Sequence, residues 1–226
     1  SELTRDHEIM DATYRLPDGS VYTKYNFTVY KGKNHVYGLM GDHVGLWFIE
    51  PVNESMNGGP LKQDLTVHQT NTTPIVNWMN ESSHYGSPYV TPKQGWSKIY
   101  GPMFVYINEG NSRQQLWRDA KEKAKQEINK WPYTWLKSPI YGIGQRGSVS
   151  GKLTVASRVT PDNAWIILGN STPDWQFQGG ENYLYYTRAD KNGHFTIPSV
   201  RKGTYTLYAI VKGVPGEFKQ DGIVVK

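Results

Sequence analysis

Alternating apolar and polar residues dominate the first half of this chain. From Val21 to Tyr30 the side chains alternate with a period of two, which predicts a β-strand with one polar face that carries Lys24. Two apolar runs, His35–Met40 and Val44–Glu50, are separated by Gly41-Asp42-His43, a pattern typical of a β-hairpin. Further strands are expected at Pro74–Met79 and Met103–Asn108.

One segment has a helical period instead. It begins at Asn111 or Ser112, either of which can cap a helix N-terminus, and it ends where Pro132 removes a backbone donor. We interpret it as a linking helix, the hinge between two domains. Its apolar positions recur at helical spacing: Leu116, Ala120, Ala124, Ile128 and Trp131.

From Gly147 onward, short strands alternate with turns that contain Gly, Asn and Pro. Six strands are expected here: SVSGKLTVAS, AWIILGN, NYLYYTRAD, GHFTIPSV, GTYTLYAIV and DGIVVK. Their number and spacing within about 80 residues predict a β-sandwich of immunoglobulin-like topology. Alternation within the segments AWIILGN and GTYTLYAIV indicates which side chains point inward. The expected core includes Trp165, Ile167, Tyr205, Leu207 and Val224.

The aromatic composition indicates what kind of ligand the chain could bind. The chain has 8 Trp and 16 Tyr but only 6 Phe. Trp and Tyr combine a flat apolar face with a polar tip, which suits a surface that stacks on sugar rings and hydrogen-bonds hydroxyls. Packing within β-sheets is the alternative use of these residues.

The net charge and the absence of cysteines argue against several kinds of partner, metal and cofactor. A net charge of +5 could serve an acidic polysaccharide, nucleic acid or anionic lipid. Lys and Arg are scattered among acids, so no nucleic-acid partner is expected. No apolar run approaches the roughly 20 residues that span a bilayer, so no membrane partner is expected either. There are no cysteines, and the histidines lack metal-ligand spacing, so we expect no metal and no cofactor.

Several segments resemble one family. They are YTKYNF, GDHVGLWFI, NGGPLKQDL and MNESSH in the first half, and RGSVSGKLTV, AWIILGN and YLYYTRADKNGHFTIPSVRKGTYTLYAIVKGVPGEF in the second. In this order they resemble rhamnogalacturonan lyases of polysaccharide lyase family 4. The resemblance implies an all-β fold: residues 1–138 form the C-terminal part of a β-supersandwich (galactose mutarotase-like) catalytic domain, ending in the linking helix. Residues 139–226 form a fibronectin III/immunoglobulin-like β-sandwich.

The resemblance also implies an activity. Such rhamnogalacturonan endolyases cleave the rhamnose-galacturonate bond of rhamnogalacturonan I, the acidic pectin backbone, by β-elimination. A base removes the proton on C5, and the oxygen leaving C4 receives a proton. The family's lysine falls on Lys24 and its histidine on His84. The substrate-binding residues are expected to be Tyr22, Asn26, Trp78 and Tyr85.

Other interpretations stay open at this point. Without the resemblance, Lys24 would be a solvated strand lysine and His84 a loop histidine bonded to backbone. The chain could be a non-catalytic carbohydrate-binding or scaffold fragment of such an enzyme, or a cell-surface adhesin built from β-sandwich modules. The resemblance further implies a secreted, extracellular protein. Substrate-clamping arginines are expected in an N-terminal segment outside this sequence, and a third, carbohydrate-binding domain after it.

Overall fold

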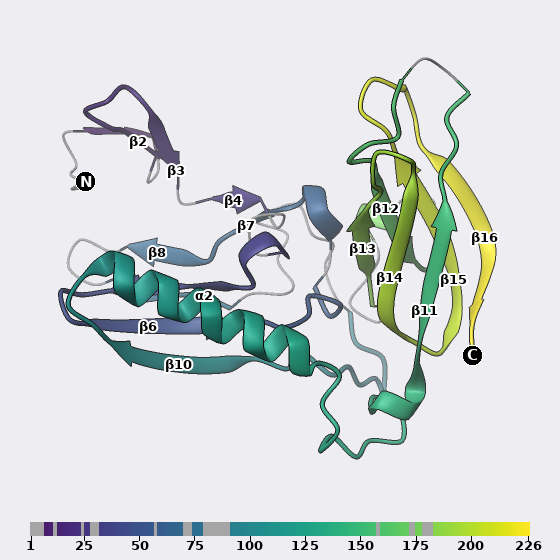
Figure 1. Ribbon diagram of the computed structural model, residues 1–226, viewed down its shortest axis with the longest axis horizontal. Helices are drawn as coiled ribbons and strands as arrows, with labels where there is room; N and C mark the ends of the chain where they lie inside the picture. The colour runs from purple at the N-terminus through teal and green to yellow at the C-terminus, as the bar shows by residue number, and fades with distance from the viewer. Residues whose placement is uncertain are drawn as a thin grey trace.

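The computed structural model describes residues 7–10, 13–23, 25–27, 32–56, 58–69, 74–78, 91–156, 159–171, 175–177 and 183–226. These residues form antiparallel β-sheets and one long helix, arranged in two halves that lie side by side (Figure 1). The all-β fold class expected from the sequence is confirmed.

The first half is built around a three-stranded sheet in the order β10-β6-β5. Its strands are β5 (Val36–Met40), β6 (Val44–Ile49) and β10 (Phe104–Glu109). The predicted hairpin is confirmed: β5 pairs with β6, and the amide of Gly41 donates to the carbonyl of Val44 at 2.8 Å.

Helix α2 (Arg113–Lys130) covers one face of this sheet (Figure 1). Ser112 caps the helix, since its side chain accepts a hydrogen bond from the amide of Gln115. The predicted boundaries are therefore confirmed. The helix links the two halves along the chain, but it also belongs to the core of the first half rather than acting as a free hinge. The shared core contains Val36, Trp47, Ile49, Leu116, Ala120 and Ala124.

The single strand predicted over Val21–Tyr30 is wrong. Within the described residues this segment contributes to two sheets: β3 (Val21–Thr23) pairs with β2, and β4 (Asn26–Phe27) pairs with β7. Alternation defines the two faces of an extended segment but does not specify its partner, so the sequence could not reveal this change of sheet. The remaining strands here are β1 (Glu8–Met10), β2 (Thr13–Arg15), β7 (Gln63–Asp64), β8 (Val67–Gln69) and β9 (Pro74–Val76).

The second half is a β-sandwich. One sheet has the order β13-β12-β15-β16 and the other pairs β11 with β14 (Figure 1). All six predicted strands are present: β11 (Arg146–Lys152), β12 (Trp165–Gly169), β13 (Tyr185–Arg188), β14 (His194–Arg201), β15 (Gly203–Ile210) and β16 (Phe218–Val225).

Only Tyr205 and Leu207 of the five predicted core residues belong to the core between the two sheets of the sandwich. Trp165, Ile167, Tyr205 and Leu207 are buried, but Val224 is 59% exposed. Ile223, Val224 and Val225 are consecutive apolar residues, so alternation alone does not fix which face points inward. Pairing with β15 decides which of these side chains is buried. Val224 lies opposite exposed Thr204, and the side chain of Val225 enters the core instead.

The larger sheet is buried on both faces, which alternation did not predict. Ile166 and Leu168 face the interior of the sandwich, together with Tyr205 and Leu207. Trp165 and Ile167 lie on the opposite face in a second apolar cluster. That cluster also contains Trp175, Leu184 and Tyr208. Strand β12 therefore has no solvent face, because the first half of the chain approaches it from outside.

Hydrogen bonds to Glu127 connect the C-terminal end of α2 to Tyr133 in the segment that follows. Its carboxylate accepts hydrogen bonds from Lys123 at 2.9 Å, Lys130 at 3.0 Å and the Tyr133 hydroxyl at 2.7 Å. Burial by itself would raise the pKa of Glu127, but these hydrogen bonds lower it to about 2. The ionised carboxylate is therefore part of the folded structure.

Acid should remove this stabilisation over a defined pH window. In the unfolded chain Glu127 takes up a proton near its ordinary pKa of 4.5, whereas the folded carboxylate stays charged to about pH 2. The contribution is complete above pH 4.5 and is lost as the pH falls towards 2. Urea unfolding should show that Glu127→Gln is less stable than the parent at pH 7, with the difference shrinking below pH 4.5. A difference that does not vary with pH would contradict this assignment.

Candidate functional site

Three of the predicted site residues, Lys24, His84 and Tyr85, lie outside the described residues. Lys24 stands between β3 and β4 in the sequence. Tyr22 belongs to β3 and is 38% exposed, and the backbone of Asn26 belongs to β4. The shared groove predicted for Lys24 and His84 stays a prediction.

Trp78 follows β9 and is half-buried. Its ring meets that of Tyr100 edge-on, with the ring centroids 6.2 Å apart. The ammonium group of Lys98 lies 4.8 Å from the Tyr100 ring centroid and 5.7 Å from that of Tyr183, which belongs to the second half. An aromatic and cationic cluster therefore extends from Trp78 to the junction between the halves.

A buried ion pair joins the two halves. Arg146, at the start of β11, donates to both carboxylate oxygens of Glu54 at 2.7 and 2.8 Å, and both side chains are almost fully buried. Arg146 also donates to the carbonyls of Ser199 at 2.7 Å and Tyr141 at 3.2 Å. Burial disfavours the charge of Arg146, but hydrogen bonds from its guanidinium to Glu54 raise its pKa above the ordinary value. Neither charge is left without compensation.

A backbone hydrogen bond and close packing also hold the two halves together. The amide of Leu184 donates to the carbonyl of Glu54 at 2.9 Å. Gly59, in a turn of the first half, lies so close to Trp175 and Leu184 that a Cβ there would come within 2.6 Å and 2.9 Å of their side chains. Its positive φ of 64° also favours glycine. The arrangement of the two halves is therefore fixed by close packing as well as by charge.

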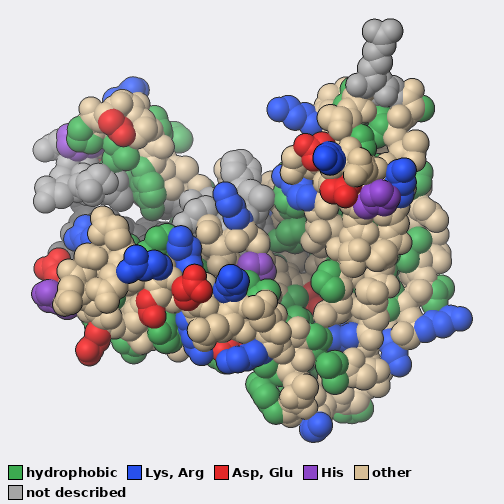
Figure 2. All heavy atoms as spheres, in the orientation of Figure 1, with side chains coloured by type: hydrophobic (Ala, Val, Ile, Leu, Met, Phe, Trp, Pro, Cys, Tyr) green, Lys and Arg blue, Asp and Glu red, His purple; other side chains and the backbone are tan. Residues whose placement is uncertain are grey.

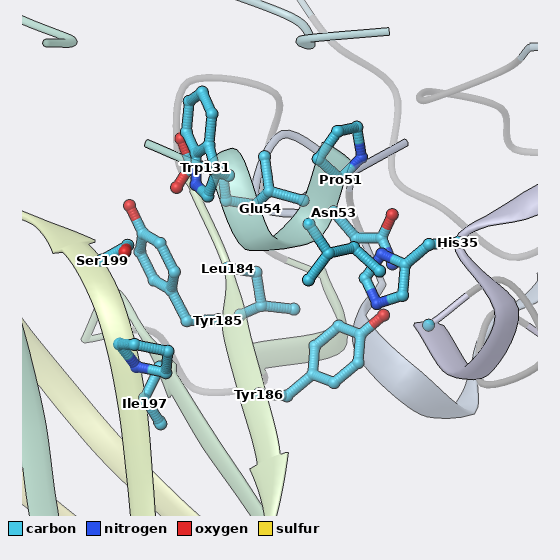
Figure 3. Close-up of a pocket in the computed structure, with 14 residues that line it drawn as sticks. His35, Pro51, Asn53, Glu54, Trp131, Leu184, Tyr185, Tyr186, Ile197 and Ser199 are labelled. Carbon is cyan, nitrogen blue, oxygen red and sulfur yellow. The ribbon is translucent and has the colours of Figure 1, made fainter. Parts of the chain in front are cut away.

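A pocket of about 330 Å³ lies at this junction. In the first half it is lined by His35, by the segment 51–54 after β6, and by Ile128 and Trp131 at the end of α2. Residues 184–186 and 197–199 line it from the sandwich. Figure 3 shows Pro51, Asn53 and His35 opposite Tyr185, Ile197 and Ser199, and Figure 2 shows the surface recessed between the halves.

Arginine stacking gives one wall of the pocket its rigidity. The guanidinium carbon of Arg146 lies 4.7 Å from the centroid of the Trp131 ring and 4.5 Å from that of Tyr141. Arg201 stacks on Tyr183 at 4.0 Å. The contact with Arg146 helps to hold the Trp131 ring in place, whereas Arg201 and Tyr183 stack outside the pocket lining.

Sequence reasoning missed this pocket and the ion pair. Arg146 and Gly59 both fall within segments that carry the family resemblance, but nothing local pairs Arg146 with a carboxylate 92 positions away. Glu50 and Glu54 are close to each other in the sequence, so the sequence does not show which of the two carboxylates pairs with Arg146. Only the fold brings these groups together.

Within the described ranges, no group of three or more His, Asp or Glu side chains is positioned to hold a metal ion. No helix in the part of the chain that the structure describes is long and apolar enough to cross a membrane.

The known proteins to which this chain was found to be similar include rhamnogalacturonate lyases. Residues 145–226 match the family model described as polysaccharide lyase family 4, domain II. A rhamnogalacturonate lyase from Dickeya dadantii is 37% identical over 94% of this chain and 35% of its own length. Rhamnogalacturonate lyase B from Emericella nidulans is 32% identical over 96% of this chain and 36% of its own length.

The fold and these comparisons define a class: an all-β protein whose second half is a fibronectin III-like sandwich. The resemblance noted in the sequence is confirmed: residues 145–226 match domain II of polysaccharide lyase family 4, and almost the whole chain is similar to part of the rhamnogalacturonate lyases. The chain spans about a third of the length of the curated relatives that it matches.

Proposed function

We propose that this chain is part of a pectin-degrading lyase that cleaves the rhamnose-galacturonate bond of rhamnogalacturonan I by β-elimination. The observation that carries the proposal is 37% identity to a rhamnogalacturonate lyase over 94% of the chain. The abundant Tyr and Trp residues and the net charge of +5 suit an acidic polysaccharide.

Two proton carriers perform the reaction in this proposal. Lys24 removes the proton from C5 of the galacturonate, which is acidified by the adjacent carboxylate. The C5–H electron pair forms the C4–C5 double bond as the bond from C4 to the leaving oxygen breaks. His84 gives that oxygen a proton, a role suited to an imidazole at near-neutral pH. Tyr22, Asn26, Trp78 and Tyr85 contact the sugars on either side.

We further propose that residues 1–138 are the C-terminal part of a larger catalytic β-supersandwich. The face of the β10-β6-β5 sheet opposite α2 supports this, because it is apolar and partly uncovered. Val105 lies across from Phe48 on this face, and Ile107 lies across from Leu46. Val105 is 60% exposed and Ile107 is 64% exposed. A sheet with one apolar face normally packs that face on another layer.

Residues 139–226 are the second domain in this proposal, and the enzyme acts outside the cell. The proposed substrate is a polymer outside the cell, where a secreted enzyme reaches it. Arginines that neutralise the uronate carboxylate, and a third carbohydrate-binding domain, are proposed to lie in parts of the enzyme outside this sequence.

The chemical identity of the reaction product tests whether the enzyme acts by elimination. Incubating the full enzyme with rhamnogalacturonan I should generate ultraviolet absorbance from a C4–C5 unsaturated uronate at the new non-reducing ends. Addition of a chelator should leave the initial rate nearly unchanged, because the proposed mechanism uses only side-chain proton carriers. New reducing ends without the unsaturated product would show hydrolysis instead, and no cleavage at all would favour a carbohydrate-binding or scaffold role.

A further inference from the structure

The loop that joins α2 to β11 (residues 131–143, the linker loop) exposes several large apolar side chains. Trp135 is 65% exposed, Ile140 is 58% exposed and Ile143 is 50% exposed. Single exposed apolar residues are ordinary on a protein surface, but a group of them indicates an interaction site. Figure 2 shows hydrophobic side chains gathered on the surface where this loop runs in Figure 1. The linker loop is therefore a candidate binding surface.

The linker loop folds back on itself, so its exposed side chains are not spread along an extended chain. The amide of Gly142 donates to the carbonyl of Ser138 at 3.1 Å. The carbonyl oxygen of Leu136 lies 2.9 Å from the point that a Cβ on Gly142 would occupy. Trp135 and Ile143 directly flank this close approach in the sequence. The two exposed side chains therefore belong to one compact surface.

The ring of Trp135 is held with one face against the protein. It stacks on the Tyr133 ring with the centroids 5.2 Å apart and 25° between the ring planes. Tyr133 is buried, its ring meets those of Phe104 and Trp131 edge-on, and its hydroxyl donates to the Glu127 carboxylate at 2.7 Å. Trp135 thus rests on a ring that is itself fixed. Because most of its own surface is exposed, it presents its outer face to solvent as a preformed flat platform.

The charges along this part of the chain favour an acidic partner. Between Glu127 and Asp162 the sequence contains no Asp or Glu, but it includes Lys130 and Lys137 on the two sides of Trp135. Both lysines are exposed. The negative charge of Glu127 is balanced because Lys123 and Lys130 both donate to its carboxylate. A cationic stretch beside a flat aromatic ring suits a polymer that combines sugar rings with carboxylates.

We propose that the linker loop is a second binding surface for an acidic polysaccharide, with Trp135 as its stacking platform. One sugar ring packs its C–H face on Trp135, and neighbouring uronate carboxylates lie near Lys130 and Lys137. The inference rests on the substrate class of the proposed function. Lys24 stands between β3 and β4, which Figure 1 shows well separated from the linker loop. The surface therefore holds the polymer outside the proposed catalytic groove.

Affinity electrophoresis of the full enzyme in native gels that contain polygalacturonate tests this surface. This acidic polymer lacks the rhamnose-galacturonate bond, so binding is measured apart from the proposed cleavage, and a failed lyase assay would not change the result. Polygalacturonate should retard the parent. Trp135→Ala should weaken the apparent association about three- to tenfold, the effect of losing one aromatic stacking contact. Trp135→Phe keeps a flat ring and should retain most of the binding.

An aromatic control and a neutral polymer make the result specific. Phe218→Ala removes another exposed aromatic side chain, from β16, and should leave the retardation unchanged. A neutral galactan in the gel should retard the parent much less than polygalacturonate does. The proposal is wrong if polygalacturonate does not retard the parent, if Trp135→Ala is retarded like the parent, or if galactan retards the parent equally.

Charge and stability measurements separate this role from a structural one. Lys137→Gln should weaken the retardation by polygalacturonate, and added salt should reduce the difference from the parent. Lys191→Gln removes an exposed cation from the sandwich and should have no effect. The thermal midpoint of Trp135→Ala should stay close to that of the parent, because the side chain is mostly exposed. A lowered midpoint with unchanged retardation would show that Trp135 packs against another part of the enzyme, and would overturn the proposal.

Discussion

Replacing Lys24 or His84 with alanine is expected to lower the turnover number of the full enzyme by about a hundred- to ten-thousandfold, the usual contribution of a general acid or base. Lys24→Ala removes the proposed base for C5, and His84→Ala removes the proposed proton donor to the leaving oxygen. Initial rates of unsaturated-uronate formation measure both effects. The thermal midpoint should change little, because both side chains are expected on a solvent-lined groove.

Matched surface variants provide the control for this experiment. Lys152→Ala and His43→Ala each remove an exposed side chain of the same type and should leave turnover unchanged. A pH profile adds a readout that a purely structural role would not change: His84→Ala should remove one limb of the rate profile. If both Lys24→Ala and His84→Ala retain parental turnover, the catalytic assignment is wrong, even though the enzyme could still be a lyase.

Breaking the ion pair between Glu54 and Arg146 is expected to destabilise the protein by about 3 to 5 kcal/mol, because the remaining charge stays buried without its partner. Glu54→Leu and Arg146→Met should each show this loss in urea unfolding at pH 7. Arg146→Met also removes the hydrogen bonds to Ser199 and Tyr141, so it should be the more damaging of the two.

The double variant shows whether the loss comes from the unpaired charge. Replacing both members with apolar residues leaves no buried charge, so the double variant should be less destabilised than the sum of the two single variants. Lys152→Met removes an exposed cation from the same strand as Arg146 and should change stability little. Additive single-variant effects would show that the two side chains act independently and that their contact does not hold the halves together.

Much of the secondary structure could be predicted from the sequence because its causes are local. The cap at Ser112 and the stop at Pro132 bound α2 correctly, and alternation located the six strands of the sandwich. The resemblance to family 4 lyases depended on segments of sequence and is likewise confirmed. The roles of Lys24 and His84 depend on that resemblance and stay predictions.

The incorrect predictions concern segments whose local pattern allows two arrangements, so that contacts with distant segments decide between them. The segment from Val21 divides between two sheets because β3 and β4 find different partners. Val224 and Val225 are equally apolar, and only pairing with β15 selects Val225 for the core. In both cases the local pattern permits two arrangements, and long-range pairing selects one.

The sequence by itself therefore determined the all-β class, the helix with its boundaries, the strands of the sandwich and the family resemblance. These follow from the period, capping and turn preferences of neighbouring residues, which act over a few positions. Only the tertiary structure decided that Arg146 meets Glu54, 92 positions away, and that Asn53, Trp131 and Tyr186 share one pocket. Such contacts depend on how two packed halves fit together, and that fit is a property of complete surfaces rather than of any local pattern.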